Sequence, residues 1–262
     1  MRDALSSSVD YLRSDAARAS VAHDPYWPKW DSPWWHVLAL REAAHADLVP
    51  REILIALVEA SAQHYLPFFP RPPEVLPPGK SLLSDVMCFC ALGSLLCAAH
   101  GIAEIPWAHD FIVKYQLPDG GWNCDEKSSV SSIVSTVPVL EWLVDKPGLR
   151  PVFDRGMTYL LDRGLFRSKR TGAIIDEAWL EPSMPRFYEY DVLRGLRLVK
   201  RSGLPLPREA LERLKGSNVR CWPLSEQARA SDGVASSFPL LDALSRPEVA
   251  RPLIEAELAA LG

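Results

Sequence analysis

The sequence predicts an all-α protein, and three observations point to this fold class. Apolar residues recur at three- and four-residue steps along most of the chain, as they do on one face of a helix. The alternating β-branched pattern that is typical of strands is nearly absent. Segments of two kinds, one almost without charge and one amphipathic, alternate with a period of about 50 residues, which indicates an array of helical hairpins.

The nearly uncharged segments each open on a small, polar or aromatic residue. Because they carry few charges, we expect protein to cover both of their faces, and they should form an inner layer of apolar helices. These segments are Trp34–Leu48, Ser84–Ala99, Ser129–Val144, Tyr188–Lys200 and Ser236–Leu244.

The amphipathic segments each open at a proline, a residue that the first turn of a helix tolerates. We expect them to form an outer layer. They are Pro50–Tyr65, Pro106–Tyr115, Pro151–Arg163, Pro207–Lys215 and Pro247–Leu261.

A further helix is expected near Asp3–Ala19. The pairs predict one domain over residues 1–262, an α/α toroid of about five to six helical hairpins, because an open solenoid would need polar capping repeats that the sequence lacks. Residues 1–30 would form an N-terminal helix and a lead-in rich in proline and tryptophan.

Charge and cysteine content exclude several classes of protein. The chain has 29 Lys and Arg against 33 Asp and Glu, a net charge of −4, which argues against a nucleic-acid partner. No apolar run reaches the roughly 20 residues of a membrane span, and the first residues lack the apolar stretch of a signal peptide. The five cysteines contain no CxxC pair and suit reduced thiols. We therefore expect a cytoplasmic protein without membrane insertion, resident metal or cofactor.

The segment FIVKYQLPDGGW, from Phe111 to Trp122, resembles the QW repeat of squalene and hopene cyclases. Weaker echoes occur at residues 159–164 and 220–222, and residues 165–196 resemble small bacterial cyclase-like proteins. The resemblance implies the α/α-toroid fold that these cyclases share with protein prenyltransferases. It also implies an architectural role for Gln116, which would tie off backbone groups at helix ends, and for Trp122, which would stack beneath it.

The known chemistries of such toroids fit this sequence poorly. Class II terpene cyclases protonate an alkene with a DxDD-type aspartic acid, and no DxDD occurs here. Prenyltransferases bind zinc through Asp, Cys and a later His, but no histidine follows Cys124. A different zinc set, such as His109, Cys124 and Asp125, remains open as an alternative that would support thiol chemistry. Sugar-cleaving toroids use two carboxylates, here drawn from Asp31, Asp85, Asp125, Glu189 and Asp191.

The most concentrated polar cluster lies in PRFYEYDVLRGL. If a helix begins at Tyr188, then Tyr188, Asp191 and Gly195 share one face, at the mouth of a cavity. Asp191 and Glu189 are our candidates for the general acid and base, with Tyr188 or Tyr190 as a proton donor. Alternatively, Asp191 pairs with an arginine, Arg186 or Arg194, and Glu189 compensates the helix dipole.

Other aromatic, thiol and charged side chains are expected to bind a substrate at the ends of the inner helices. These candidates are Trp34, Trp35, His36, Cys88, Cys124, Asp125, Arg186 and Arg170.

The uncharged inner helices and nine tryptophans predict an apolar, aromatic-rich pocket for a hydrophobic, isoprenoid-like molecule. If the protein is an enzyme, acid/base cyclization or isomerisation is expected. The alternatives are a non-catalytic binding or scaffold protein, zinc-dependent prenyltransferase-like chemistry, and a docking partner that uses the proline-rich segment Leu66–Pro78. The sequence leaves the oligomeric state open.

Overall fold

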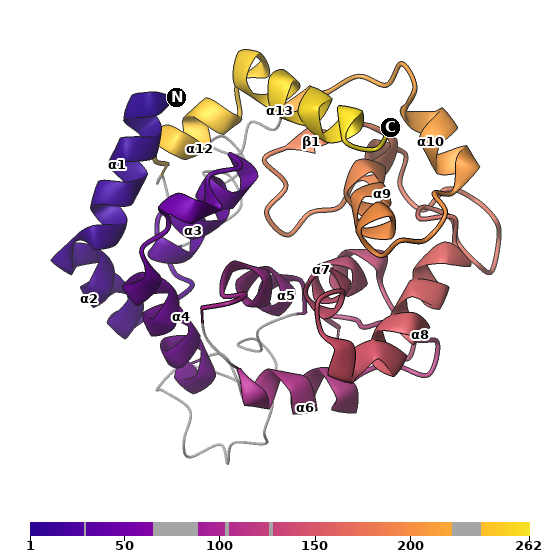
Figure 1. Cartoon of the computed structure of the whole chain (residues 1–262), viewed down its shortest axis with the longest axis horizontal. Coiled ribbons are helices and arrows are strands. Elements are labelled where there is room, and N and C mark those ends of the chain that lie inside the picture. Colours follow the sequence, from indigo (N-terminus) through magenta and orange to yellow (C-terminus); the bar gives the residue numbers. More distant parts are fainter. Residues whose placement is uncertain (29, 65–88, 103–104, 126–127, 222–236) are drawn as a thin grey trace.

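Helices make up most of the computed structural model, which describes the chain except for residues 29, 65–88, 103–104, 126–127 and 222–236 (Figure 1). The α-helices of the described part are α1 (Arg2–Arg13), α2 (Asp15–His23), α3 (Pro33–Glu42), α4 (Arg51–His64), α5 (Phe89–Ala98), α6 (Pro106–Lys114), α7 (Ile133–Leu143), α8 (Arg150–Leu161), α9 (Val192–Arg201), α10 (Arg208–Leu214), α12 (Pro239–Leu244) and α13 (Pro247–Ala259). Two short strands, β1 (Ser183–Met184) and β2 (Arg220–Cys221), pair in parallel. The prediction of a mostly helical protein is confirmed.

All ten predicted inner and outer segments coincide with a described helix. Prolines occupy the first turn of α3, α6, α8, α12 and α13, where their missing N–H costs no hydrogen bond. None of the helices in the described ranges is both long and apolar enough to cross a membrane.

The single helix expected near Asp3–Ala19 is wrong, because the chain breaks there into α1 and α2. Ser14 lies between them in an extended conformation. Its hydroxyl donates to the Tyr11 carbonyl at 2.6 Å and accepts from the Ala17 N–H at 3.2 Å. Ser14 thus ends one helix and caps the next.

The start expected for the fourth inner helix is also wrong. α9 begins at Val192 rather than Tyr188, because Asp191 is its N-cap and accepts the backbone N–H of Arg194 at 2.8 Å. Tyr188 and Asp191 therefore precede the helix and do not share a face of it with Gly195.

The helices pack in a circuit that runs from α3 to α5, α7, α9, α13 and α12 and returns to α3. Figure 1 shows them around a common centre, with α1 at the N-terminus beside α12. Outside this circuit α4 packs on α2 and α3, α8 on α7, and α10 on α9.

The backbones of α5 and α7 approach each other closely at Gly93, where a Cβ would lie 2.4 Å from the Pro138 carbonyl carbon. Glycine at this position therefore lets the two helices touch.

The side chains of the QW-like segment join α6 to α8 and to the loop before α7. The Gln116 side-chain amide donates to the carbonyls of Gly120, at 2.6 Å, and Val152, at 2.8 Å. Trp122 is fully buried, and its indole N–H donates to the Ile112 carbonyl at 3.0 Å. Gly120 has a φ of 103°, and a Cβ there would lie 2.5 Å from the Arg155 carbonyl oxygen, so the turn requires glycine. Gln116 and Trp122 thus hold backbone segments together in this region, whereas the stacking of Trp122 beneath Gln116 stays a prediction.

Candidate functional site

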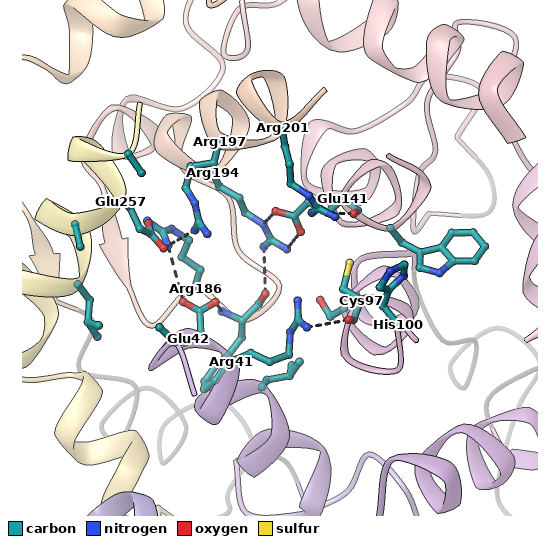
Figure 2. Close-up of a pocket in the computed structure, with 18 of the residues that line it drawn as sticks. Arg41, Glu42, Cys97, His100, Glu141, Arg186, Arg194, Arg197, Arg201 and Glu257 are labelled. Carbon is teal, nitrogen blue, oxygen red and sulfur yellow. Dashed lines mark hydrogen bonds and ion pairs between the residues drawn. The ribbon is translucent and has the colours of Figure 1, made fainter. Parts of the chain in front are cut away.

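A cavity of about 590 Å³ lies within the helix circuit, and charged side chains from four helices and three connecting segments surround it (Figure 2). Ten of its nineteen lining residues have acidic, basic or imidazole side chains, namely Arg41, Glu42, His100, Glu141, Asp145, Arg186, Arg194, Arg197, Arg201 and Glu257. The others are Leu38, Ala44, Ser94, Cys97, Trp142, Phe187, Leu253, Ala256 and Ala260. Among the described residues, the wall is thus not the apolar, aromatic-rich surface that the sequence predicted.

Two helices, α9 and α13, account for most of the difference between the predicted apolar wall and the charged wall of the structure. α9 carries arginines at positions 194, 197 and 201, and steps of three and four residues place them on one face of the helix, which lines the cavity. α13 was expected in the outer layer, yet Leu253, Ala256 and Glu257 line the cavity. The prediction of an apolar inner layer fits α5 and α7 but is wrong for α9.

The buried part of the wall is organised around Arg186, whose side chain is only 2% exposed. Its Nε donates to Asp191 Oδ2 at 2.6 Å, and its Nη2 donates to Glu257 Oε2 at 2.7 Å. Glu42 Oε2 lies 3.9 Å from its Nη1. Burial opposes the charged form of Arg186, but the three carboxylates outweigh this effect and raise the pKa of its guanidinium. Arg186 therefore stays charged inside the protein.

A second buried arginine, Arg194, joins α9 to α7. Its Nε and Nη2 donate to the two carboxylate oxygens of Glu141 at 2.9 and 2.7 Å, a bidentate arrangement. Its Nη1 donates to the carbonyls of Phe187, at 3.1 Å, and Glu189, at 2.8 Å. Arg194 thus fixes the loop before α9 against the cavity. Phe187 in this loop has a φ of 52°, a left-handed conformation that is uncommon for a side chain of this size.

Three further arginines occupy a more exposed rim, which we define as Arg41, Arg197 and Arg201. Arg197 forms an ion pair with Glu257, and Arg201 forms one with Asp145. Arg41 donates to the Cys97 carbonyl at 2.8 Å, an interaction drawn in Figure 2. Within the part of the chain that the structure describes, Arg41 forms no ion pair with a carboxylate. The wall holds five guanidinium groups and four carboxylates, and Asp191 supplies a fifth carboxylate to Arg186 from behind the wall.

The environments of two cavity carboxylates push their pKa values in opposite directions. Burial raises the pKa of Glu42, and the charge of Arg186 offsets this only in part. Burial also acts to raise the pKa of Glu141, but the paired Arg194 outweighs it, so the pKa of Glu141 is lowered. One cavity carboxyl thus favours its protonated form more than the other does.

The residues predicted as acid, base and proton donor, Tyr188 to Asp191, lie outside the lining of the cavity. Asp191 is fully buried, and its Oδ2 accepts the Ser183 N–H at 2.8 Å in addition to Arg186. The alternative in which Asp191 pairs with Arg186 is therefore confirmed. Tyr190 is also buried and donates to the Leu165 carbonyl at 2.9 Å; burial raises its pKa well above the ordinary value. Neither side chain lines the cavity.

The other two members of that cluster are half-buried and also lie off the cavity wall. Tyr188 stacks near Trp30, with ring centroids 6.2 Å apart. The backbone carbonyl of Glu189 accepts a hydrogen bond from Arg194. Their catalytic role stays a prediction.

The aromatic candidates at the start of α3 belong to the core rather than to the cavity. Trp34 and Trp35 are buried, and the Trp35 indole donates to the Tyr26 carbonyl at 3.1 Å. His36 is buried as well, with its ring stacked on Phe238 at a centroid distance of 3.8 Å. Burial lowers the pKa of His36, so the ring is neutral at neutral pH.

The remaining candidates are scattered. Arg186 lines the cavity, but its side chain is buried and paired with carboxylates, so its role in substrate binding stays a prediction. Arg170 and Asp125 are exposed, and Cys124 is half-buried against Cys90, off the cavity wall. Cys88 lies outside the described residues, as does Leu66–Pro78.

The described residues bring no three His, Cys, Asp or Glu side chains into an arrangement that could hold a metal ion. The alternative zinc set of His109, Cys124 and Asp125 is thus not assembled. His109 instead packs its ring edge-on against Trp142, with centroids 5.2 Å apart.

Arg41, Glu42, Glu141, Arg197, Arg201 and Glu257 line the cavity but were not among the residues predicted from the sequence. The regular spacing of arginines in α9 was a visible signal, because an inner helix has no reason to carry a cationic face unless that face meets carboxylates or a ligand. Glu257 could not be found in this way, since 71 residues separate it from Arg186.

Comparisons of the chain with models of protein families, with curated proteins and with solved structures gave no match.

Proposed function

We propose that the chain is a single α/α toroid whose central cavity binds a small organic anion, one that carries a carboxylate or phosphate group. The arginine-lined cavity is the observation that carries this proposal. The closed helix circuit and the positions of α4, α8 and α10 outside it support the toroid. A cavity of about 590 Å³ is in the size range of metabolite sites.

The rim arginines are the groups that would bind the anion. Guanidinium groups present several N–H donors in a plane and match carboxylate and phosphate oxygens. Arg41 has no carboxylate partner among the described residues, and Arg197 and Arg201 are each about half exposed, so a ligand can reach them. An anion would add to Arg41 and compete with Glu257 and Asp145 for the other two.

The uncharged side chains of the wall can receive a modest apolar part of the same ligand. Leu38, Trp142, Phe187 and Leu253 contribute this surface. Of the hydrophobic, isoprenoid-like molecules that the sequence suggested, one with a charged head therefore suits the cavity better than one without.

A matched pair of ligands tests the proposal. We expect geranyl diphosphate to raise the midpoint of thermal unfolding in a concentration-dependent way, because a ligand that binds only the folded state stabilises it. Pyrophosphate and citrate should act in the same direction, and geraniol, which lacks the charged group, should not. Equal stabilisation by geraniol, or no stabilisation by any of the anions, would contradict the proposal.

The variant Arg41→Gln locates the site. Loss of one charged contact to an anion should weaken binding by about 10-fold or more, since hydrogen bonds to charged groups contribute roughly 1.5–3 kcal/mol. Arg150→Gln is the matched control, because Arg150 is exposed on α8 away from the cavity wall and forms an exposed ion pair with Asp154 four residues on. If both variants bind the anion as the unchanged protein does, the cavity is not the site.

A second candidate function, acid/base catalysis on the bound anion, is favoured by the opposite pKa shifts of Glu42 and Glu141. A carboxyl group that keeps its proton can act as an acid beside a group that stays ionised. This assignment replaces Asp191 and Glu189 with two carboxyls that line the cavity. NMR titration of carboxyl-labelled glutamate, assigned with Glu42→Gln, should place the midpoint of Glu42 above that of Glu141. The reverse order would remove Glu42 as the acid.

A further inference from the structure

Two cysteine thiols meet outside the cavity, between α5 and the loop that precedes α7. The Cys124 S–H donates to the sulfur of Cys90, and the two Sγ atoms lie 3.7 Å apart. The two residues are 34 positions apart in the chain, so folding rather than sequence proximity brings them together.

Neighbouring groups hold Cys124 in position. The hydroxyl of Ser135 in α7 donates to Cys124 Sγ at 3.1 Å, and the same oxygen accepts the backbone N–H of Cys124 at 3.1 Å. A hydroxyl donor favours the thiolate, the form of cysteine that reacts with oxidants. Cys124 is half-buried whereas Cys90 is 8% exposed, so an oxidant reaches Cys124 first.

The other described cysteines lack such a neighbour. Cys97, also in α5, donates to the Pro138 carbonyl at 3.7 Å, and burial raises its pKa to about 12. Burial also raises the pKa of Cys221 in β2. Both should remain thiols under mild oxidation, and they serve as internal controls.

We propose that Cys90 and Cys124 are a redox-active pair that a peroxide converts to an intramolecular disulfide. In the first step the Cys124 thiolate attacks hydrogen peroxide, the O–O bond breaks, and a sulfenic acid and hydroxide form. In the second step the Cys90 sulfur attacks the sulfenic sulfur and the S–O bond breaks. The Cys90 proton leaves with the departing hydroxide as water. Two thiols are oxidised, and one peroxide is reduced to two waters.

The geometry requires only a local movement. A disulfide holds its sulfurs about 2 Å apart, so the thiols must approach further from 3.7 Å. Cys124 lies in a loop and can supply this movement by side-chain rotation. The bond would tie α5 to the segment that enters α7, two helices that pack directly on each other.

Mass spectrometry of the full-length protein tests the pair. The reduced protein is treated with hydrogen peroxide, denatured, alkylated and digested. We expect the protein to lose the mass of two hydrogen atoms, and one linked peptide to join Cys90 to Cys124. A reductant such as dithiothreitol should restore both thiols. Because the cross-link restricts the unfolded chain, the oxidised protein should also unfold at a higher temperature than the reduced protein.

Cysteine variants test whether the disulfide joins Cys90 to Cys124 rather than another pair of cysteines. Cys97→Ala should form the disulfide as the unchanged protein does. Cys90→Ser should instead accumulate the Cys124 sulfenic acid, which dimedone traps. The proposal is overturned if both thiols remain alkylatable after peroxide treatment, or if fragmentation of the linked peptide places the disulfide on any other cysteine, Cys88 included.

Discussion

The cavity is bordered by two groups of arginines that differ in burial and in partners. Arg186 and Arg194 are 2% and 9% exposed, and Arg186 faces three carboxylates while Arg194 forms a bidentate pair. The rim arginines Arg197 and Arg201 are about half exposed and have one carboxylate partner each. Arginine thus has two different roles around the cavity. The buried pair holds the fold together, and the rim arginines, with Arg41, can bind a ligand.

Energetics explains why the two groups should behave differently on mutation. Removing one partner of a buried ion pair leaves an uncompensated charge and costs about 3–5 kcal/mol. Exposed ion pairs contribute about 0–1 kcal/mol, because water and salt screen them. Variants of the buried group should therefore change stability, and variants of the rim should change binding.

The largest expected effect is that of Asp191→Ala. This change removes the N-cap of α9, the acceptor for the Ser183 N–H and the closest carboxylate of Arg186. We expect a loss of about 3–5 kcal/mol in the free energy of unfolding, measured with urea. The control Asp154→Ala breaks an exposed pair on α8 and should cost less than about 1 kcal/mol. Equal losses in the two variants would show that Asp191 does not anchor the buried network.

Glu141→Gln should have an intermediate effect that depends on pH. Because pairing with Arg194 lowers the pKa of Glu141, its stabilising contribution is complete above the pKa of the unfolded chain. That contribution is lost as the pH falls through the folded-state pKa. The variant should therefore be less stable than the unchanged protein by about 1–3 kcal/mol at neutral pH, and by less in acid. Urea unfolding across this range checks the trend, and a pH-independent difference would contradict it.

Glu42→Gln should show the opposite pH trend. Burial raises the pKa of Glu42, so the folded protein keeps a proton that the unfolded chain has already released. Stability from this group is then lost as the pH rises from the unfolded toward the folded pKa. A neutral glutamine does not titrate, and the variant should gain stability relative to the unchanged protein over that window. The same urea series measures this gain, and a relative loss on raising the pH would contradict the assignment.

Arg41→Gln should have the smallest effect on stability. Arg41 forms no ion pair with the described residues, and its contact is one hydrogen bond to the Cys97 carbonyl. We expect a change of about 0.5–1.5 kcal/mol in unfolding free energy, together with the weakened anion binding described above. A loss as large as that of Asp191→Ala would place Arg41 in the structural group instead.

The helices were predictable from the sequence because local signals define them. Prolines mark the first turns of α3, α6, α8, α12 and α13, and mostly apolar runs mark α5 and α7. Boundaries set by polar side chains were missed, since Ser14 and Asp191 cap helices through hydrogen bonds that spacing does not reveal.

The candidate site was less predictable because residues from distant parts of the chain form it. Four helices and one loop contribute its charged residues Glu42, Glu141, Arg186, Arg194 and Glu257. No local sequence pattern indicates that these side chains form ion pairs with one another. The abundance of tryptophan was misleading, because large rings fill a core as readily as they line a pocket. Trp34, Trp35 and Trp122 all fill the core.

Crystals grown with selenate would test the central claim most directly, since selenate resembles sulfate and phosphate in shape and gives an anomalous signal. We expect an anomalous peak inside the cavity, within hydrogen-bond distance of the Arg41 guanidinium, that disappears in Arg41→Gln. A cavity without a peak, alongside selenate bound at other arginines on the surface, would contradict the assignment of the rim as an anion site.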